Sequence, residues 1–292
     1  MMDSHDEEIT GLFKLYLQQL GYNKSTCYML PACVDSFFSY QGTIAPWDIT
    51  AMHITSFIED LHTRPNKKRE GGLSEVYIYH HVYAMKLFFS YLEETGQISY
   101  NPMNVMTFKR PKYNSREPLT REEVSQLFEA AKTMKEIVVL HLFYSCGLRR
   151  SEAEALQVRD IHLKSGLLYV REGKGHKRRA IPITAKVSLD IEAYYLQERD
   201  KCQATARGRG ALVLGVMGDR MSGNGYNKLL KGICQRAGIE RAISLHHLRH
   251  SIATHLLENG MTVEFVRDFL GHSYLEATQV YTKVSKQKIR SI

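Results

Sequence analysis

The stretch from Ser244 to Tyr281 reads SLHHLRHSIATHLLENGMTVEFVRDFLGHSYLEATQVY and carries more information about this chain than any other segment. His246 and Arg249 are three positions apart in a segment with helical periodicity, so their side chains leave the same face. His272 and Tyr281 follow across a short predicted helix and a glycine. Basic and imidazole groups near a tyrosine hydroxyl suit the binding of a phosphodiester during attack by an oxygen nucleophile.

A second informative segment lies upstream. Residues 144–152 read YSCGLRRSE and place Arg149 directly after a glycine-containing break, at the start of a new helical period. A hairpin is predicted next, with strands near 167–172 and 178–183. The connection between them, residues 173–177, reads GKGHK and sets Lys174 between two glycines.

These segments together resemble the tyrosine recombinase (phage-integrase-like) family, and its bacterial Xer-type members in particular. The matching pieces are Gly147-Leu148-Arg149-x-Ser151-Glu152, Gly173-Lys174-Gly175, His246-x-x-Arg249-His250, Leu270-Gly271-His272-Ser273 and Tyr281. They occur in the family's order and spacing between residues 117 and 285. The resemblance implies a site-specific recombinase that cuts and rejoins duplex DNA through a 3′-phosphotyrosyl intermediate, in integration, excision, inversion or dimer resolution, without a cofactor.

Length and charge agree with this interpretation without requiring it. A chain of 292 residues exceeds what one core usually needs and favours two domains. The formal net charge of +8 favours a polyanionic partner, although ribosomal contacts or an anionic membrane would be served equally well.

Cysteine usage and the amino terminus predict an intracellular protein. The five cysteines are scattered without a C-x-x-C pair, so neither a disulfide framework nor a thiolate zinc site is expected. The acidic start does not resemble a signal peptide, and no apolar run approaches the ~20 residues that a membrane span needs. We expect a cytoplasmic, nucleoid-associated protein with no membrane contact.

Periodicity predicts a mainly α fold with a small antiparallel sheet (α+β). Four amphipathic helices with short loops are expected in the amino-terminal third. Thr120-x-x-Glu123 is a capping box that opens the next domain, where helices are expected near 121–132 and 136–146. The predicted organisation is a helical domain at 1–101, a linker at 102–118 and a second domain at 119–292. The resemblance makes the first a core-binding domain and the second the tyrosine-recombinase catalytic domain, which together close around DNA.

Arg149 and Arg249 are the expected phosphate-binding pair, because guanidinium groups bind phosphate oxygens bidentately and stay charged. Arg150 is the nearest alternative to Arg149. Tyr281 is the expected nucleophile, and Tyr274 lies too close to His272 for the family's spacing. A phenol has a pKa of about 10, so it needs nearby positive charge or a base to attack at neutral pH.

The resemblance makes Lys174 the general acid that protonates the leaving 5′ oxygen, and Lys177 is the alternative for this role. Lys174 could instead belong to a basic turn that makes ordinary phosphate contacts. His246 suits proton transfer near neutral pH, and His272 suits a hydrogen bond to a phosphate oxygen. Glu152 is expected to orient Arg149 or a histidine. The pair His246 and His250 lacks a third ligand at zinc spacing, so no metal is predicted. The other histidines of this region, His247, His250 and His255, are expected to be structural.

A set of basic residues is expected to contact the DNA backbone without reading its sequence, although a solvated charge run would account equally well for each one alone. These residues are Lys67, Lys68, Arg69, Lys109, Arg110, Lys112, Lys177 and Arg178. The expected partner is double-stranded DNA with paired recombination sites, bound by a homotetramer in the synaptic complex that forms from free monomers. Two alternatives stay open: a type IB topoisomerase-like enzyme that relaxes supercoils, and a catalytically silent DNA-binding regulator.

Overall fold

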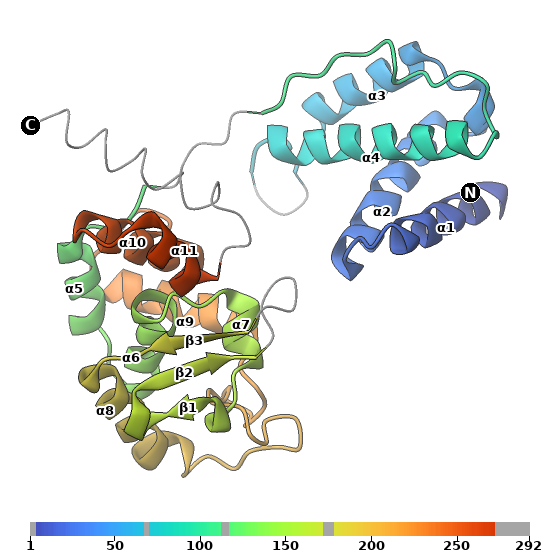
Figure 1. Ribbon diagram of the computed structural model, residues 1–292. Helices are drawn as coiled ribbons and strands as arrows, with labels where there is room; N and C mark the ends of the chain where they lie inside the picture. The colour runs from blue at the N-terminus through green and yellow to red at the C-terminus, as the bar shows by residue number, and fades with distance from the viewer. Residues whose placement is uncertain (1–3, 67–69, 112–116, 172–177, 272–292) are drawn as a thin grey trace, which may run out of the picture. The chain divides into compact units, whose positions relative to one another are not determined.

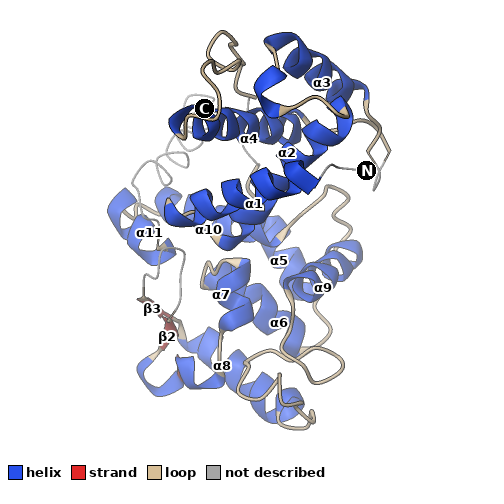
Figure 2. Ribbon diagram, turned by 90° about the vertical axis from the view of Figure 1, so that its right-hand side faces the viewer, coloured by secondary structure: helices blue, strands red, loops and turns tan. Residues whose placement is uncertain are grey.

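The chain forms two compact units, Met1–Asn114 (unit 1) and Ser115–Ile292 (unit 2) (Figure 1). The structure, a computed structural model, describes residues 4–66, 70–111, 117–171 and 178–271. Helices make up most of the described secondary structure, and one three-stranded antiparallel sheet accompanies them (Figure 2). The predicted fold class, mainly α with a small antiparallel sheet, is therefore confirmed. None of the described helices is long and apolar enough to cross a lipid bilayer.

Unit 1 contains the four predicted helices. Side-chain caps fix two of their starts: Asn23 accepts a hydrogen bond from the Thr26 N–H at 2.9 Å, and Ser74 accepts one from the Tyr77 N–H at 3.3 Å. The bounds are α1 (Ser4–Gln19), α2 (Lys24–Gln41), α3 (Ala51–Thr63) and α4 (Glu75–Glu94).

The core of unit 1 is built from phenylalanine rings on all four helices. Phe37 of α2 meets Phe57 of α3 edge to face with 5.3 Å between ring centroids, and Phe13 of α1 meets Phe88 of α4 at the same distance. Edge-to-face pairs of this kind add to the gain from burying apolar area. The rings hold the four helices together.

The described part of unit 2 combines a small sheet with seven α-helices. The sheet has the order β1-β2-β3, and Val170 of β2 pairs with Arg179 of β3. The strands are β1 (Ile161–His162), β2 (Leu167–Val170) and β3 (Arg179–Pro182), and the helices are α5 (Arg121–Glu129), α6 (Met134–Leu140), α7 (Arg150–Ala155), α8 (Ala185–Tyr194), α9 (Gly223–Arg236), α10 (Leu245–Glu258) and α11 (Val263–Leu270). The predicted capping box opens α5: Thr120 and Glu123 exchange hydrogen bonds at 2.8 and 3.1 Å.

Helix α6 differs from the prediction at both ends. It starts at Met134 rather than near 136, because Thr133 caps it by accepting the Glu136 N–H at 3.2 Å. It then widens into a π-helical turn, His141–Ser145, whose last bond runs from the Cys146 N–H to the His141 carbonyl at 2.8 Å. Such turns are frequent at functional sites. This one leads directly into the Gly147-Leu148-Arg149 segment.

Helices α10 and α11 form one end of unit 2, where α11 lies beside β3 (Figure 1). Helix α10 starts at Leu245 because the side chain of His247 bonds back to Ser244, with 2.8 Å between Nδ1 and Oγ. Helix α11 ends at Leu270, and the C-cap residue Gly271 adopts the left-handed conformation with φ of 65°. A glycine takes this conformation without the steric cost that other residues meet.

Candidate functional site

The side chain of Glu152, 1% exposed, is the centre of the site. It lies in the first turn of α7 and accepts two hydrogen bonds from Arg149, one from the backbone N–H at 2.8 Å and one from Nη1 at 2.7 Å. Arg179 donates from Nη1 and Nη2 to its two oxygens at 2.9 and 2.8 Å. Arg249 Nη1 lies 3.8 Å from Oε2. One buried carboxylate therefore gathers three arginines from distant parts of the chain.

Arg149 immediately precedes α7, in the extended conformation of a helix N-cap. Its side chain is 23% exposed, and Nη2 donates to the carbonyl of Gly271 at 2.8 Å. Arg150, the alternative considered from the sequence, is more exposed and lies 3.8 Å from Glu154 on the outer side of the helix. Of the two neighbours, Arg149 is the one that turns inward.

Arg249 is buried, with 2% of its side chain exposed. Nη1 donates to the carbonyl of Gly147, and Nη2 donates to the carbonyl of Leu270 at 2.7 Å. The two expected phosphate-binding arginines thus share an acid and also bind adjacent carbonyls of one turn. The next residue after that turn is His272.

The two glycines of the site are favoured by close contact as well as by backbone conformation. A Cβ on Gly147, whose φ is 58°, would lie 2.8 Å from a methyl of Leu270 and 3.3 Å from the ring of Phe269. A Cβ on Gly271 would lie 2.8 Å from Nη1 of Arg179. A Cβ closer than 3.0 Å would force Leu270 or Arg179 to shift, and both glycines adopt a positive φ that other residues rarely take, so the contact between the two segments favours glycine at these positions.

The electrostatics of this cluster favour an additional anion. Burial raises the pKa of Glu152, but the hydrogen bonds and charge of Arg179 and the hydrogen bonds from Arg149 outweigh it and hold that pKa at about 2. The acid is therefore ionised at any ordinary pH. Three guanidinium groups around one carboxylate leave an excess of two positive charges.

The histidines of α10 differ in environment. His246 is exposed on the first turn, His247 caps the helix, and His250 and His255 are buried. His255 shares a hydrogen bond with the Tyr144 hydroxyl at 2.9 Å. Among the residues that the structure describes, no group of three or more His, Cys, Asp or Glu could hold a metal ion.

Arg179 is the site residue that the sequence interpretation missed. Its neighbours make residues 177–179 look like one basic turn, in which Lys177 and Arg178 were expected to contact DNA and Lys177 was also the alternative to Lys174. Strand alternation supplies the missing signal, because Arg179 lies two positions before the fully buried Ile181 and so shares its inward face. Arg178 is exposed.

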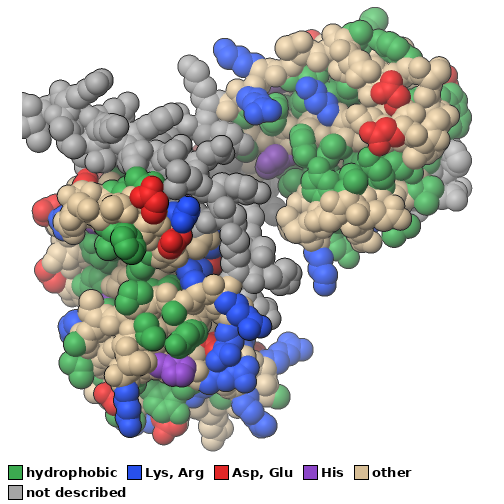
Figure 3. Space-filling view, viewed as in Figure 1, with side chains coloured by type: hydrophobic (Ala, Val, Ile, Leu, Met, Phe, Trp, Pro, Cys, Tyr) green, Lys and Arg blue, Asp and Glu red, His purple; other side chains and the backbone are tan. Residues whose placement is uncertain are grey.

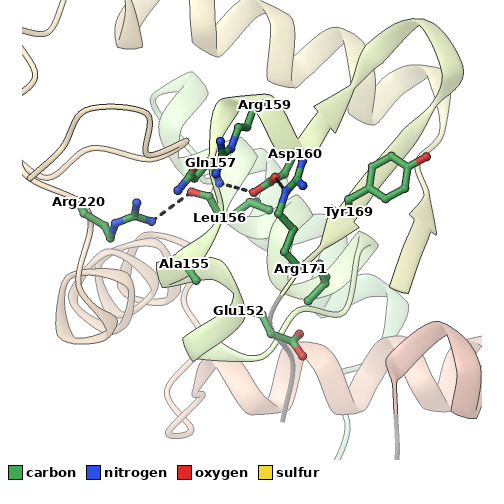
Figure 4. Close-up of a pocket in the computed structure, with 10 residues that line it drawn as sticks. Glu152, Ala155, Leu156, Gln157, Arg159, Asp160, Tyr169, Arg171 and Arg220 are labelled. Carbon is green, nitrogen blue, oxygen red and sulfur yellow. Dashed lines mark hydrogen bonds and ion pairs between the residues drawn. The ribbon is translucent and has the colours of Figure 1, made fainter. Parts of the chain in front are cut away.

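A pocket of about 370 Å³ opens beside the cluster and is lined partly by Glu152 (Figure 4). Arg171 forms an ion pair with Asp160, and Arg220 donates to the carbonyl of Leu156 at 3.4 Å. Arg159 also lines the pocket and is exposed. Lysine and arginine side chains gather on this face of unit 2 (Figure 3).

Several predicted residues lie outside the described ranges. They are Lys174, His272 and Tyr281 of the expected catalytic set, and Lys67, Lys68, Arg69, Lys112 and Lys177 of the expected DNA contacts. Lys109 and Arg110 are described and exposed in unit 1. Of the expected catalytic residues, the structure brings together Arg149 and Arg249, with Glu152 between them.

Known proteins resemble this chain over most of its length. The model of the phage integrase family matches residues 117–288. The tyrosine recombinase XerD of Oceanobacillus iheyensis is 34% identical over 255 residues, which cover 85% of this chain and 82% of the relative. XerC of Bacillus subtilis is 29% identical, over 98% and 95% of the two chains.

The fold is also that of solved structures. The site-specific recombinase XerH bound to its palindromic difH substrate superposes with a TM-score of 0.69 and 21% identity, over 91% of this chain and 78% of that one. The segment that the family model matches, residues 117–288, contains Glu152 and the three arginines around it, Arg149, Arg179 and Arg249. The chain therefore belongs to the phage integrase family of tyrosine recombinases, enzymes that break and rejoin DNA at specific sites.

Proposed function

We propose that the cluster around Glu152 holds the scissile phosphodiester of a DNA recombination site while Tyr281 attacks it. The observation that carries the proposal is that Arg149 and Arg249, 100 positions apart, share one buried carboxylate and bind adjacent carbonyls just before His272. The excess of two positive charges around that acid suits the extra negative charge of a pentacoordinate transition state.

In the proposed reaction, the Tyr281 oxygen forms a bond to phosphorus and the bond from phosphorus to the 5′ oxygen breaks. The phenol proton passes to His246 or to water, and Lys174 gives a proton to the departing 5′ oxygen. His272 and the two arginines bind the non-bridging oxygens. The 3′-phosphotyrosyl link keeps the energy of the broken ester, so attack by a 5′ hydroxyl of another strand rejoins DNA without an external energy source.

Glu152 has a supporting role in this scheme. Its oxygens accept from Arg149 and Arg179, and the pairing fixes the plane of the Arg149 guanidinium before DNA arrives. Holding donors in place in advance avoids reorganisation during the reaction. The pocket lined by Arg159, Arg171 and Arg220 supports a further part of the proposal, a DNA backbone phosphate bound next to the cut.

Assembly follows from the chemistry. One protomer cuts one strand, so exchange between two duplexes needs four protomers, and we propose a homotetramer on paired sites. In this proposal, unit 1 is the core-binding domain, and the protein acts in the bacterial cytoplasm. A lambda integrase relative has been solved as a dimer bound to a core site. Relaxation of supercoiled plasmid without strand exchange would instead indicate the topoisomerase alternative.

A nicked duplex tests the proposal. DNA crosslinked to the protein in its native cell is first sequenced to obtain the target, and a nick is then placed so that the short 5′-hydroxyl fragment diffuses away after cleavage. We expect the wild type and Tyr274→Phe to form a covalent adduct on a denaturing gel and Tyr281→Phe to form none. An adduct with Tyr281→Phe, or none with the wild type, would contradict the assignment.

A further inference from the structure

Arg179 links two segments that the proposed function needs. Its Nε donates to the carbonyl of Phe269 at 3.0 Å, and its two terminal nitrogens donate to both oxygens of Glu152. The side chain is 10% exposed. One guanidinium thus joins β3, the first turn of α7 and the end of α11.

Arg179 and its partner Phe269 each lie within a few positions of an expected catalytic residue in the sequence. Arg179 is the first residue of β3, and its pairing with Val170 closes the connection that contains Lys174. Phe269 precedes His272 by three residues. The same side chain therefore bonds the residue three positions before His272 in the sequence and the carboxylate that binds Arg149.

Close packing of the α11 terminus against the guanidinium strengthens the link. A Cβ on Gly271 would lie 2.8 Å from Nη1, 3.0 Å from Cδ and 3.2 Å from Cζ of Arg179. The turn that binds Arg149 through the Gly271 carbonyl therefore rests directly on Arg179. A side chain of another length would change where that turn lies.

We propose that Arg179 is a positioning residue of the strand-cutting centre, which holds the first turn of α7, where Glu152 binds Arg149, against the end of α11 at Phe269. This inference rests on the proposed function, because it assigns to Arg179 the alignment of that same centre. Arg179 acts through its neighbours and does not touch DNA.

A direct phosphate contact by Arg179 is the competing explanation. Three of its five N–H groups are already donated to Glu152 and Phe269, and the side chain is nearly buried. The adjacent Arg178 is exposed and better placed for such a contact. These contacts favour positioning.

Arg179→Lys tests the inference, because lysine keeps the charge but loses the planar fork that binds two carboxylate oxygens and a carbonyl. Arg241→Lys is the matched control: Arg241 also donates two bonds to one carboxylate, Glu123 at 2.9 and 2.6 Å, and one to the carbonyl of Pro118 at 3.3 Å. Arg179→Gln provides a second variant in case the lysine variant does not fold.

Two rates separate positioning from DNA binding. On the nicked duplex at saturating protein, we expect Arg179→Lys to slow single-turnover adduct formation by about 100-fold, the scale of a small misplacement of reacting groups. The DNA dissociation constant and its salt dependence should equal those of the wild type, and Arg241→Lys should cleave at the wild-type rate. A wild-type cleavage rate for both Arg179 variants, or a loss that weaker DNA binding explains, would overturn the inference.

Hydrogen exchange without DNA gives a readout that does not depend on cleavage. We expect Arg179→Lys to speed amide exchange in residues 150–154 and 266–271 and to leave α5 unchanged, while Arg241→Lys should do the reverse. Unchanged exchange in 150–154 and 266–271 would show that Arg179 does not hold these segments, whatever nucleophile the enzyme uses. Failure of the Tyr281 assignment alone would leave the exchange result standing.

Discussion

The Glu152 carboxylate is the side chain whose loss we expect to disturb unit 2 most. Glu152→Gln leaves Arg149 and Arg179 facing a neutral group in a buried site. Removing one partner of a buried ion pair typically costs about 3–5 kcal/mol, so the free energy of unfolding at neutral pH should fall by that amount. Denaturant unfolding measures it. Glu154→Gln on the same helix should have almost no effect, because Glu154 is 3.8 Å from an exposed arginine.

Glu152 should also shape the response of unit 2 to acid. Its pKa is about 2 in the folded protein and near 4.5 in the unfolded chain, so the unfolded chain takes up the proton first as the pH falls. The stabilisation is complete above pH 4.5 and is lost as the pH falls toward 2, by about 3 kcal/mol in total. Unfolding midpoints of the wild type between pH 5 and 2 should fall more steeply than those of Glu152→Gln. Equal slopes would contradict the assigned pKa.

The residues of the site differ in how far the sequence could predict them. Arg149, Glu152 and Arg249 stand in motifs with a definite order, and the structure brings all three together. Arg179 follows two other basic residues, so composition alone does not tell which one turns inward. Its partner Phe269 is 90 positions away, and only the packing of α11 beside β3 creates that contact.

Among the helices, the start of a helix could be predicted from the sequence where a side chain caps the first turn. Thr120 and Glu123 open α5 as expected. The π-helical turn at His141–Ser145 lies in a stretch that was predicted as ordinary helix. His141 bonds Ser145 within that turn and Asp190 of α8, both at 2.9 Å, and the pairing with Asp190 spans 49 positions, so no local pattern predicts it.

Helix α4 carries a histidine that should make unit 1 sensitive to mild acid. His81 is buried between the rings of Phe57 and Tyr77, and burial lowers its pKa to about 4. The unfolded chain binds the proton near pH 6.5, so stability is lost as the pH falls from 6.5 to about 4, by roughly 3 kcal/mol. His81→Leu should remove this dependence in tryptophan fluorescence unfolding, since Trp47 is in unit 1. A variant with the wild-type pH profile would contradict the expectation.

At the scale of the whole molecule, each unit has its own hydrophobic core. We expect calorimetry to resolve two unfolding transitions. Phe88→Ala should lower only the transition of unit 1 and Phe143→Ala only that of unit 2, each by about 3–5 kcal/mol, because both rings are fully buried. A single transition shifted equally by both variants would show that the two cores unfold together.

Charge is the other property of the whole chain, and it predicts salt-dependent DNA binding. Lys109 and Arg110 are exposed and suited to backbone phosphates. Replacing both with Ala should reduce the slope of log affinity against log salt concentration by about 2, with cleavage at saturating protein unchanged. Filter binding across a salt series measures the slope, and Lys132→Ala, an exposed lysine of unit 2, serves as the control. An unchanged slope would exclude these contacts.

Family membership was predictable from the sequence because five short motifs occur in a fixed order, and the comparisons confirm it. How the motif residues contact one another was not predictable in the same way. The shared acid is visible only once α7, α10 and β3 are folded together, since its three arginines come from positions 149, 179 and 249.

The sharing of one carboxylate by three guanidinium groups also limits how the sequence of such a protein can evolve. Replacing any one of these four charged side chains leaves the others without a full set of ion-pair partners. A series of single substitutions therefore passes through variants with reduced stability or activity. Exposed contacts such as Arg178 can be exchanged singly without that obstacle. Selection for a new target sequence should therefore accumulate changes on the outer surface, while the four ions of this cluster are inherited as a set.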